Sequence, residues 1–136
     1  MSTSYKATCH CRLTTLTFTL PHALTSPTQK IIRCNCSICT RNGYLLVYPL
    51  RTDVIFGPDN EKHLSSYRFG NMAKPHRFCA RCGTAMFIDF GESERVVERG
   101  VVGVNIRAVD GIEDLWDQLT YKDVDGKHKL GPAYQV

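Results

Sequence analysis

The sequence predicts a mainly β protein built from short strands. Two observations support this fold class. Apolar and β-branched residues occur in short runs that end at glycine, proline or asparagine, which is typical of strands and turns. No segment of ten or more residues shows a convincing helical spacing of apolar side chains. At 136 residues the chain is long enough to bury a core without disulfides, so we take residues 1–136 as a single domain.

The strands are expected in the following order. Residues 16–20 alternate apolar side chains with threonine, which indicates a half-buried strand. Residues 30–33 form a short strand, and residues 44–48 form a strand buried on both faces that ends at Pro49. Further strands are expected where alternating or β-branched side chains are concentrated, at residues 54–56, 64–69, 85–90, 96–97 and 101–106.

The segments between these strands are expected to be turns and loops. Residues 112–119 are the exception, because four apolar side chains at helical spacing make them a candidate for one short helix. The turn sequences are Asn42-Gly43, Gly70-Asn71 and Asp125-Gly126. The chain from Lys127 onward is expected to be loosely ordered.

Seven cysteines dominate the chemistry that the sequence can support. An odd number leaves one thiol over in a pure disulfide framework, and the close C-x-C and C-x-x-C spacings are typical of metal ligands. Zinc is the metal that such thiolate sets most often bind. The chain also shows no secretory segment, so a reducing compartment is expected, cytoplasmic by default with the nucleus left open.

Three of the cysteines, Cys34, Cys36 and Cys39, fall within six residues. No fourth cysteine or histidine lies nearby in the sequence to complete a tetrahedron. A zinc ion with three protein ligands keeps a fourth position for water or substrate, which distinguishes catalytic from structural zinc sites. The trio therefore predicts an open, catalytic zinc site.

The other four cysteines form two pairs that complement each other. Cys79 and Cys82 lie in a C-x-x-C-G turn of the zinc-knuckle type, which supplies two ligands. Cys9 and Cys11, two residues apart at the edge of a strand, project to the same side and supply the other two. In principle the closed site could use any four of the seven cysteines, but the reverse grouping splits the trio and leaves a thiol unused, which is less economical. His10, between two ligands, is expected to be exposed.

Charge and hydropathy limit the partners. The formal net charge is +4, and seven thiolates with two Zn²⁺ would bring the loaded protein to about +1. Lysine and arginine are dispersed with no run of five, so the composition disfavours nucleic acid as a partner. The longest apolar run, residues 44–48, is far too short to cross a membrane.

The chain resembles the glutathione-dependent formaldehyde-activating enzyme family, which includes centromere protein V. The resemblance rests on Cys9-His10-Cys11 before a threonine-rich strand, on Cys34-Asn35-Cys36-Ser37-Ile38-Cys39 with Arg41 and Gly43 behind it, on Phe78-Cys79-Ala80-Arg81-Cys82-Gly83-Thr84, on Val104-Asn105-Ile106-Arg107, and on Asp125-Gly126. It runs in order over about residues 5–126, which we take as the core of the domain.

This resemblance implies a β-tent fold of stacked antiparallel sheets with zinc-binding loops. It implies two Zn²⁺ per chain, one structural and one catalytic, on the same ligands that the spacing predicts. It also implies a carbon–sulfur lyase, or an enzyme that joins a thiol to an aldehyde, with glutathione as a candidate co-substrate. The expected partner is thus a small-molecule thiol or thiol adduct. A homo-oligomer stays open.

Three residues are candidates for substrate binding. Arg41 follows the trio and can hold a substrate carboxylate, or brace its own loop. Asn105 is a lone amide in an apolar run and needs a partner, for which backbone is favoured over substrate. His76 can shuttle a proton or be structural. Asn35 and Ser37 are expected to donate hydrogen bonds to the thiolates.

Two rival functions stay open on the sequence. One is a two-zinc interaction module that binds protein or nucleic acid without turnover, as the centromere members of the family suggest. The other is an enzyme of the same fold that acts on a specialised metabolite, because a fold and a metal site do not fix the substrate.

Overall fold

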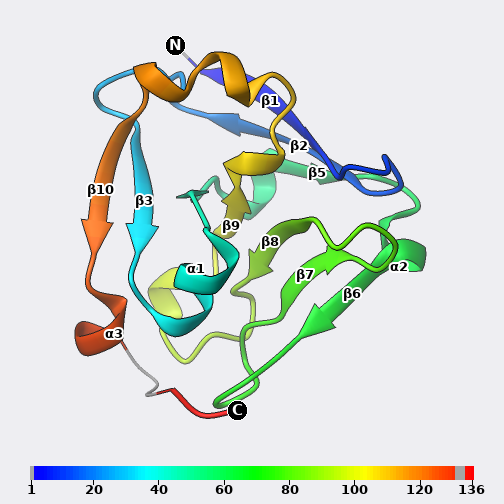
Figure 1. Cartoon of the computed structure of the whole chain (residues 1–136), viewed down its shortest axis with the longest axis vertical. Helices are drawn as coiled ribbons and strands as arrows, with labels where there is room; N and C mark the ends of the chain where they lie inside the picture. Colours follow the sequence, from blue (N-terminus) through cyan, green and yellow to red (C-terminus); the bar gives the residue numbers. More distant parts are fainter. Residues whose placement is uncertain (1, 131–133) are drawn as a thin grey trace.

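The computed structural model describes residues 2–130 and 134–136. Its strands form two sheets (Figure 1). The smaller sheet has the order β1-β2-β5, from β1 (Thr3–Thr8), β2 (Thr15–Leu20) and β5 (Val54–Phe56). The larger sheet has the order β10-β3-β4-β9-β8-β7-β6, from β3 (Lys30–Cys34), β4 (Leu46–Val47), β6 (Leu64–Tyr67), β7 (His76–Cys79), β8 (Ala85–Asp89), β9 (Val102–Asn105) and β10 (Thr120–Val124).

Helix is confined to short segments. The three α-helices are α1 (Ser37–Asn42), α2 (Asn60–His63) and α3 (Gly126–Lys129). Short 3₁₀ turns occupy Arg51–Asp53, Val96–Glu98, Ile106–Ala108, Ile112–Asp114 and Trp116–Gln118. Among the residues that the structure describes, no helix has the length and apolar character needed to cross a membrane.

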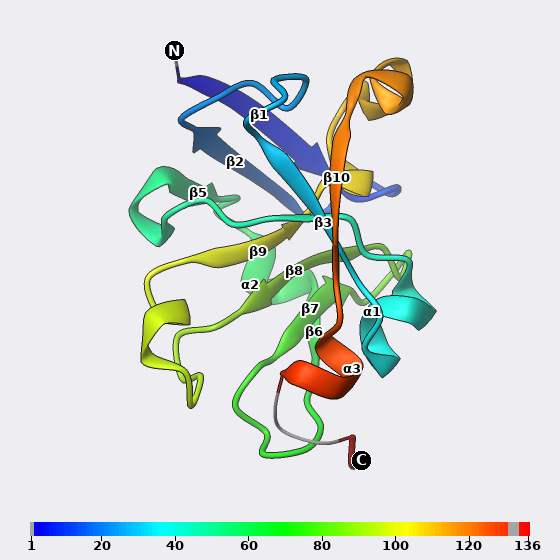
Figure 2. The same ribbon diagram turned by 90° about the vertical axis from the view of Figure 1, so that its left-hand side faces the viewer.

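The core forms where the sheets stack, with β1 and β2 crossing over the larger sheet (Figure 2). The predicted alternation of β2 is confirmed, since Leu16, Phe18 and Leu20 are buried while the threonines between them are partly exposed. Val102 and Val104 of β9 join the same cluster from the larger sheet. The predicted fold class, mainly β with stacked sheets and cysteine-bearing loops, is confirmed.

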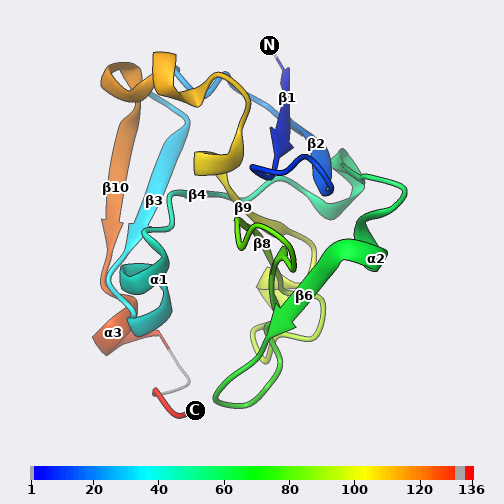
Figure 3. The same ribbon diagram turned by 45° about the vertical axis from the view of Figure 1, so that its right-hand side comes forward.

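One strand pair departs from the expected antiparallel arrangement. β3 and β10 run parallel, with Thr120 opposite Lys30 and Val124 opposite Cys34. Because the two strands end side by side, the residues that follow them also lie side by side. The chain after β10 therefore returns to the three-cysteine segment after β3, and α3 comes to lie beside α1 (Figures 1 and 3).

Several sequence-based expectations for single elements are wrong. Residues 96–97 form a 3₁₀ turn instead of a strand, with Val96 and Val97 largely exposed. Contacts within this loop favour the turn, since the Arg95 guanidinium bonds the carboxylate of Glu98 at 2.8 Å and Ser93 donates to the same carboxylate at 2.6 Å. The candidate helix at residues 112–119 is two separate 3₁₀ turns.

Two further segments are more helical than expected. The three-cysteine segment is not only a loop, because α1 begins at Ser37 within it and ends where Gly43 adopts φ 61°. A left-handed glycine is a common helix end, which is the turn predicted at Asn42-Gly43. The chain from Lys127 was expected to be loosely ordered, but α3 occupies Gly126–Lys129.

Strands β1, β7 and β10 were not predicted.

Candidate metal centres and an adjoining cavity

The four paired cysteines form one compact group. Cys9 and Cys11 lie in the connection between β1 and β2, and Cys79 and Cys82 lie at the β7–β8 turn. All four sulfurs lie within 4.8 Å of one another, with 3.7 Å between Cys9 and Cys11 and 3.5 Å between Cys11 and Cys79. Four sulfurs about 2.3 Å from a tetrahedral zinc lie about 3.8 Å apart, so this group has the geometry of a closed metal site.

Backbone conformation holds these two loops in place. Arg12 and Gly83 adopt left-handed φ values of 71° and 78°, which turn each loop back on itself. The Thr14 N–H donates to Sγ of Cys9 at 3.3 Å. Thr84 joins the loops, because its hydroxyl lies 3.2 Å from Sγ of Cys82 and accepts from the His10 N–H at 3.2 Å. The His10 side chain is exposed, as expected.

Cys34, Cys36 and Cys39 form a second group. Cys34 ends β3, Cys36 immediately precedes α1, and Cys39 lies inside α1, so a strand end and a helical turn bring the sulfurs within 4.8 Å of one another. Over residues 2–130 and 134–136, no further cysteine, histidine or carboxylate joins this group. The trio can therefore supply three ligands and leave one coordination position open.

The trio favours the thiolate form at Cys36. A hydrogen bond from the Cys39 thiol, helped by the backbone N–H groups of Cys39 and Ile38, lowers the pKa of Cys36 to about 5. The same hydrogen bond, together with burial, raises the pKa of Cys39. A metal ion binds thiolates and displaces the remaining protons, so Cys36 is the ligand best prepared for binding.

Helix α3 packs directly on the trio, which sequence reasoning missed. Burial raises the pKa of the Cys34 thiol, and the neighbouring Gly126 backbone N–H opposes that shift. A Cβ at Gly126 would overlap that sulfur and lie 3.4 Å from Cβ of Cys36. From the sequence, the Asp125-Gly126 pair was assigned a turn and a place in the family resemblance, but no contact with the trio.

A hydrogen-bonded clasp of Asn35, Asp125 and Lys127 fixes this contact. The Asn35 amide donates to the Asp125 carboxylate at 2.9 Å, and its oxygen accepts from the Lys127 N–H at 2.9 Å. Asn35 thus bonds the segment around α3 in place of the thiolates that it was expected to bond. His128 also bonds Asp125, through its backbone N–H and its ring.

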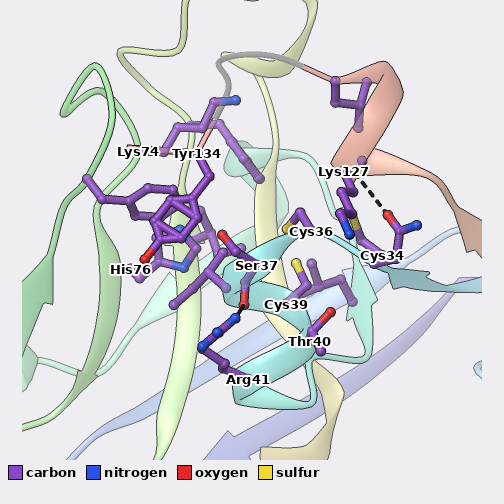
Figure 4. Close-up of a pocket in the computed structure, with 18 of the residues that line it drawn as sticks. Cys34, Cys36, Ser37, Cys39, Thr40, Arg41, Lys74, His76, Lys127 and Tyr134 are labelled. Atoms are coloured by element: carbon purple, nitrogen blue, oxygen red, sulfur yellow. Dashed lines mark hydrogen bonds between the residues drawn. The ribbon is translucent and has the colours of Figure 1, made fainter. Parts of the chain in front are cut away.

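The trio opens onto a cavity of about 400 Å³, which is a usual size for a small-molecule site. The cavity is lined by residues of α1 and α3, of β7 and β8, and of the loop that joins β6 to β7. The close-up in Figure 4 shows the cysteines of the trio on one side and Lys74, His76 and Tyr134 on the opposite side. Arg41 and His76, both predicted site residues, line the cavity together with the trio.

His76 is a buried histidine at the cavity wall. It is 5% exposed, and its Nδ1 shares a 2.9 Å hydrogen bond with the hydroxyl of Tyr44. Burial, helped by the charge of Lys74, lowers the pKa of His76 to about 4, so the ring is neutral at neutral pH. No hydrogen bond from a described residue reaches Nε2, which leaves that nitrogen available to a ligand in the cavity.

Four basic side chains line the cavity, in two different settings. Lys74 lies 3.3 Å from the Glu94 carboxylate and 3.6 Å from that of Glu98, and Arg95 also bonds Glu98. Arg41 donates to the carbonyl of Ser37 at 3.1 Å, and neither Arg41 nor Lys127 pairs with a carboxylate among the described residues. The second pair can therefore receive the negative charge of a ligand.

Asn105, the remaining candidate, is not among the cavity residues. Its amide nitrogen donates to the carbonyl of Ala85 at 2.9 Å, and its oxygen accepts from the Arg107 N–H at 3.2 Å. The side chain thus fastens β9 to β8 and caps the following 3₁₀ turn. Backbone groups occupy this amide, and nothing in the geometry directs it toward a substrate.

No protein-family model and no curated protein matches the sequence. Among solved structures, the chain is similar to a structural-genomics crystal structure of a protein from Rhodobacter sphaeroides, with a TM-score of 0.64 and 25% sequence identity. The match covers 86% of this chain and 99% of the other. This similarity supports the fold, and the description of the other protein names no activity or ligand.

Proposed function

We propose that this protein is a zinc-dependent enzyme that cleaves or forms the carbon–sulfur bond between a thiol and an aldehyde. The observation that carries the proposal is the open trio of thiols at the wall of a ligand-sized cavity. The other four cysteines form a closed group, for which we propose a structural zinc. Two cysteine groups of different completeness, of which the incomplete one lines a cavity, favour a reactive centre over two purely structural ones.

The donor set fits zinc. Three cysteine thiolates and a free position suit zinc better than hard cations, which prefer oxygen ligands. When bound, zinc would supply a position at which a substrate thiol exchanges and is held as its thiolate. Gly126 would support the metal from outside by donating its N–H to Sγ of Cys34, as groups that surround metal ligands commonly do.

The protein side chains supply binding and proton transfer. We assign Arg41 and Lys127 to carboxylates of the thiol half, because both line the cavity without a carboxylate partner of their own. We assign His76 to the proton. In cleavage, Nε2 takes the proton from the hydroxyl of the hemithioacetal, the C=O bond forms, and the C–S electron pair leaves with sulfur as a thiolate. Addition is the reverse, in which His76 returns the proton to oxygen.

We also propose that the chain belongs to the glutathione-dependent formaldehyde-activating enzyme and centromere protein V family. The order and spacing of its cysteines support this assignment, and each of the two sets predicted from that spacing is close together in the fold. Glutathione is accordingly the first thiol to test.

The test combines a metal count with turnover. Zinc per chain is measured by native mass spectrometry, and exchange between glutathione, formaldehyde and their adduct is followed by NMR. We expect two zinc ions and accelerated exchange, with Cys36→Ala folded, holding one zinc and inactive. Exchange at the uncatalysed rate with several thiols and aldehydes, in protein that holds two zinc ions, would overturn the proposal and favour a non-catalytic interaction module.

A further inference from the structure

We propose that the aldehyde-derived half of the substrate is an aromatic or comparably flat apolar group, and that it binds the aromatic part of the cavity wall. This inference rests on the proposed function, because the trio defines where the sulfur of the substrate lies. We call this surface the aromatic wall and define it by Tyr48, Phe69, Ile88, Phe90 and His76, all of which line the cavity.

The aromatic rings of this wall contact one another in pairs. The rings of Tyr48 and Phe90 lie 6.0 Å apart between centroids at 39°, and those of Phe69 and His76 lie 5.6 Å apart at 36°. Tyr134 adds an edge-to-face contact with Phe69 at 6.4 Å. Tilted rings at these separations are the arrangement that aromatic groups prefer, so a further flat ring can join the cluster.

The floor of this side is fixed and apolar. Ile88 and Phe90 are 4% and 7% exposed and belong to one buried cluster with Cys39 and Tyr44. Because Ile88 lies on β8, and Phe90 directly follows that strand, their positions are set by the sheet. A wall that is preorganised in this way does not need to reorder on binding, which increases the affinity for a matching ligand.

The basic side chains beside the aromatic wall differ in their pairing from those on the segments of the trio and α3. On the aromatic side, the cations of Lys74 and Arg95 are paired with Glu94 and Glu98, and His76 is neutral. The cations without a carboxylate partner among the described residues, Arg41 and Lys127, belong to the segments that carry the trio and α3. The cavity therefore offers anion binding on the segments of the trio and α3 and apolar contact at the aromatic wall.

A formaldehyde adduct makes little use of this arrangement. Its aldehyde half is a single carbon, which is too small to cover the rings, whereas a benzyl-sized group removes itself and the exposed part of the wall from water. Burying one aromatic ring against such a wall corresponds to roughly a 10- to 100-fold gain in affinity.

The experiment compares two stable probes on the zinc-loaded protein by isothermal titration calorimetry. The probes are 3-(benzylthio)propanoate and 3-(methylthio)propanoate, which share the carboxylate and the sulfur and differ only in the group that replaces the aldehyde half. We expect the benzyl probe to bind at least tenfold tighter. Phe69→Leu, which keeps an apolar side chain without a flat ring, should reduce that preference to about threefold or less and leave the methyl probe unchanged. Tyr121→Leu, a ring on β10 outside the cavity, is the matched control and should retain the preference.

The outcomes separate the inference from the proposed function. Equal affinities, failure of the benzyl probe to bind, or a preference that Phe69→Leu leaves intact would overturn the inference, even if the protein turns over a formaldehyde adduct. A benzyl preference that depends on Phe69 supports the aromatic wall as a binding surface whether or not exchange with formaldehyde is accelerated.

Discussion

The backbone of Gly126 contacts the sulfur of Cys34, although the two residues are far apart in the sequence. No side chain fits between them, because a Cβ at Gly126 would overlap Sγ. Asn35 and Asp125 hold the contact by a 2.9 Å hydrogen bond. The three-cysteine group is thus covered by α3, a helix of four residues that comes from a distant part of the sequence.

Replacing Gly126 by alanine should weaken metal binding at the trio without affecting the four-cysteine site. The added methyl group must displace Cys34 or α3, which moves the backbone N–H of residue 126 away from the sulfur. We expect at least a tenfold drop in zinc affinity at one of two sites, measured by competition with a chromogenic chelator. Gly100→Ala is the matched control, since a Cβ there meets no atom within 4 Å. Wild-type affinity at both sites in Gly126→Ala would refute this role.

Removing a ligand from the four-cysteine group should destabilise the fold more than removing one from the trio. The four-cysteine group joins the β1–β2 connection to the β7–β8 turn, whereas the trio joins residues close together in the sequence. We expect Cys82→Ala to lower the unfolding free energy by about 3 kcal/mol or more, or roughly 10 °C in Tm. Cys36→Ala should cost less than half of that. Calorimetry of both variants after zinc loading checks this order, and the reverse order would contradict it.

His76 should make the protein less stable as the pH falls. Its pKa is lowered from 6.5 to about 4 in the folded protein. Above pH 6.5 the ring is neutral in both states and contributes no pH dependence. Between pH 6.5 and 4 the unfolded state binds a proton that the folded state excludes, so stability falls, by up to about 3 kcal/mol at the lower end. The check is the difference in urea unfolding free energy between wild type and His76→Gln over this range. Any loss of cysteine-bound metal in acid affects both proteins equally, so it cancels in this difference. Parallel pH profiles would show that His76 does not titrate in this way.

Arg41 and Lys127 should act on substrate binding and not on folding. If they bind the carboxylates of the thiol half, Arg41→Ala and Lys127→Ala should each raise KM for glutathione about tenfold with little change in Tm. The effect should shrink when the thiol partner carries no carboxylate, such as 2-mercaptoethanol. Arg81→Ala, an exposed arginine outside the cavity, is the control. An equal loss with the uncharged thiol would mean that the cations serve the structure of the site.

Local patterns predicted the strands whose burial repeats along the sequence. The alternation of β2 and the β-branched run that contains β9 were read correctly, because β2 buries every second residue and β9 is buried along its whole length. Strands β1 and β10 were missed, because β1 buries one residue and β10 buries none. Backbone pairing of β1 with β2 and of β10 with β3 holds these segments as strands. Val96 and Val97 show the opposite error, since β-branched side chains without a partner strand form a turn.

The sequence by itself determined the grouping of the cysteines. Spacing alone separates a closed set of four from an open set of three, because a tetrahedral ion accepts only a few arrangements of close sulfurs. Only the tertiary structure decided what surrounds the open set. The parallel pairing of β10 with β3 brings Gly126 to Cys34, and the sheet order brings His76 and the aromatic rings to the same cavity as the trio. These contacts join segments up to about a hundred residues apart, and they depend on strand pairing, which no short stretch of sequence encodes.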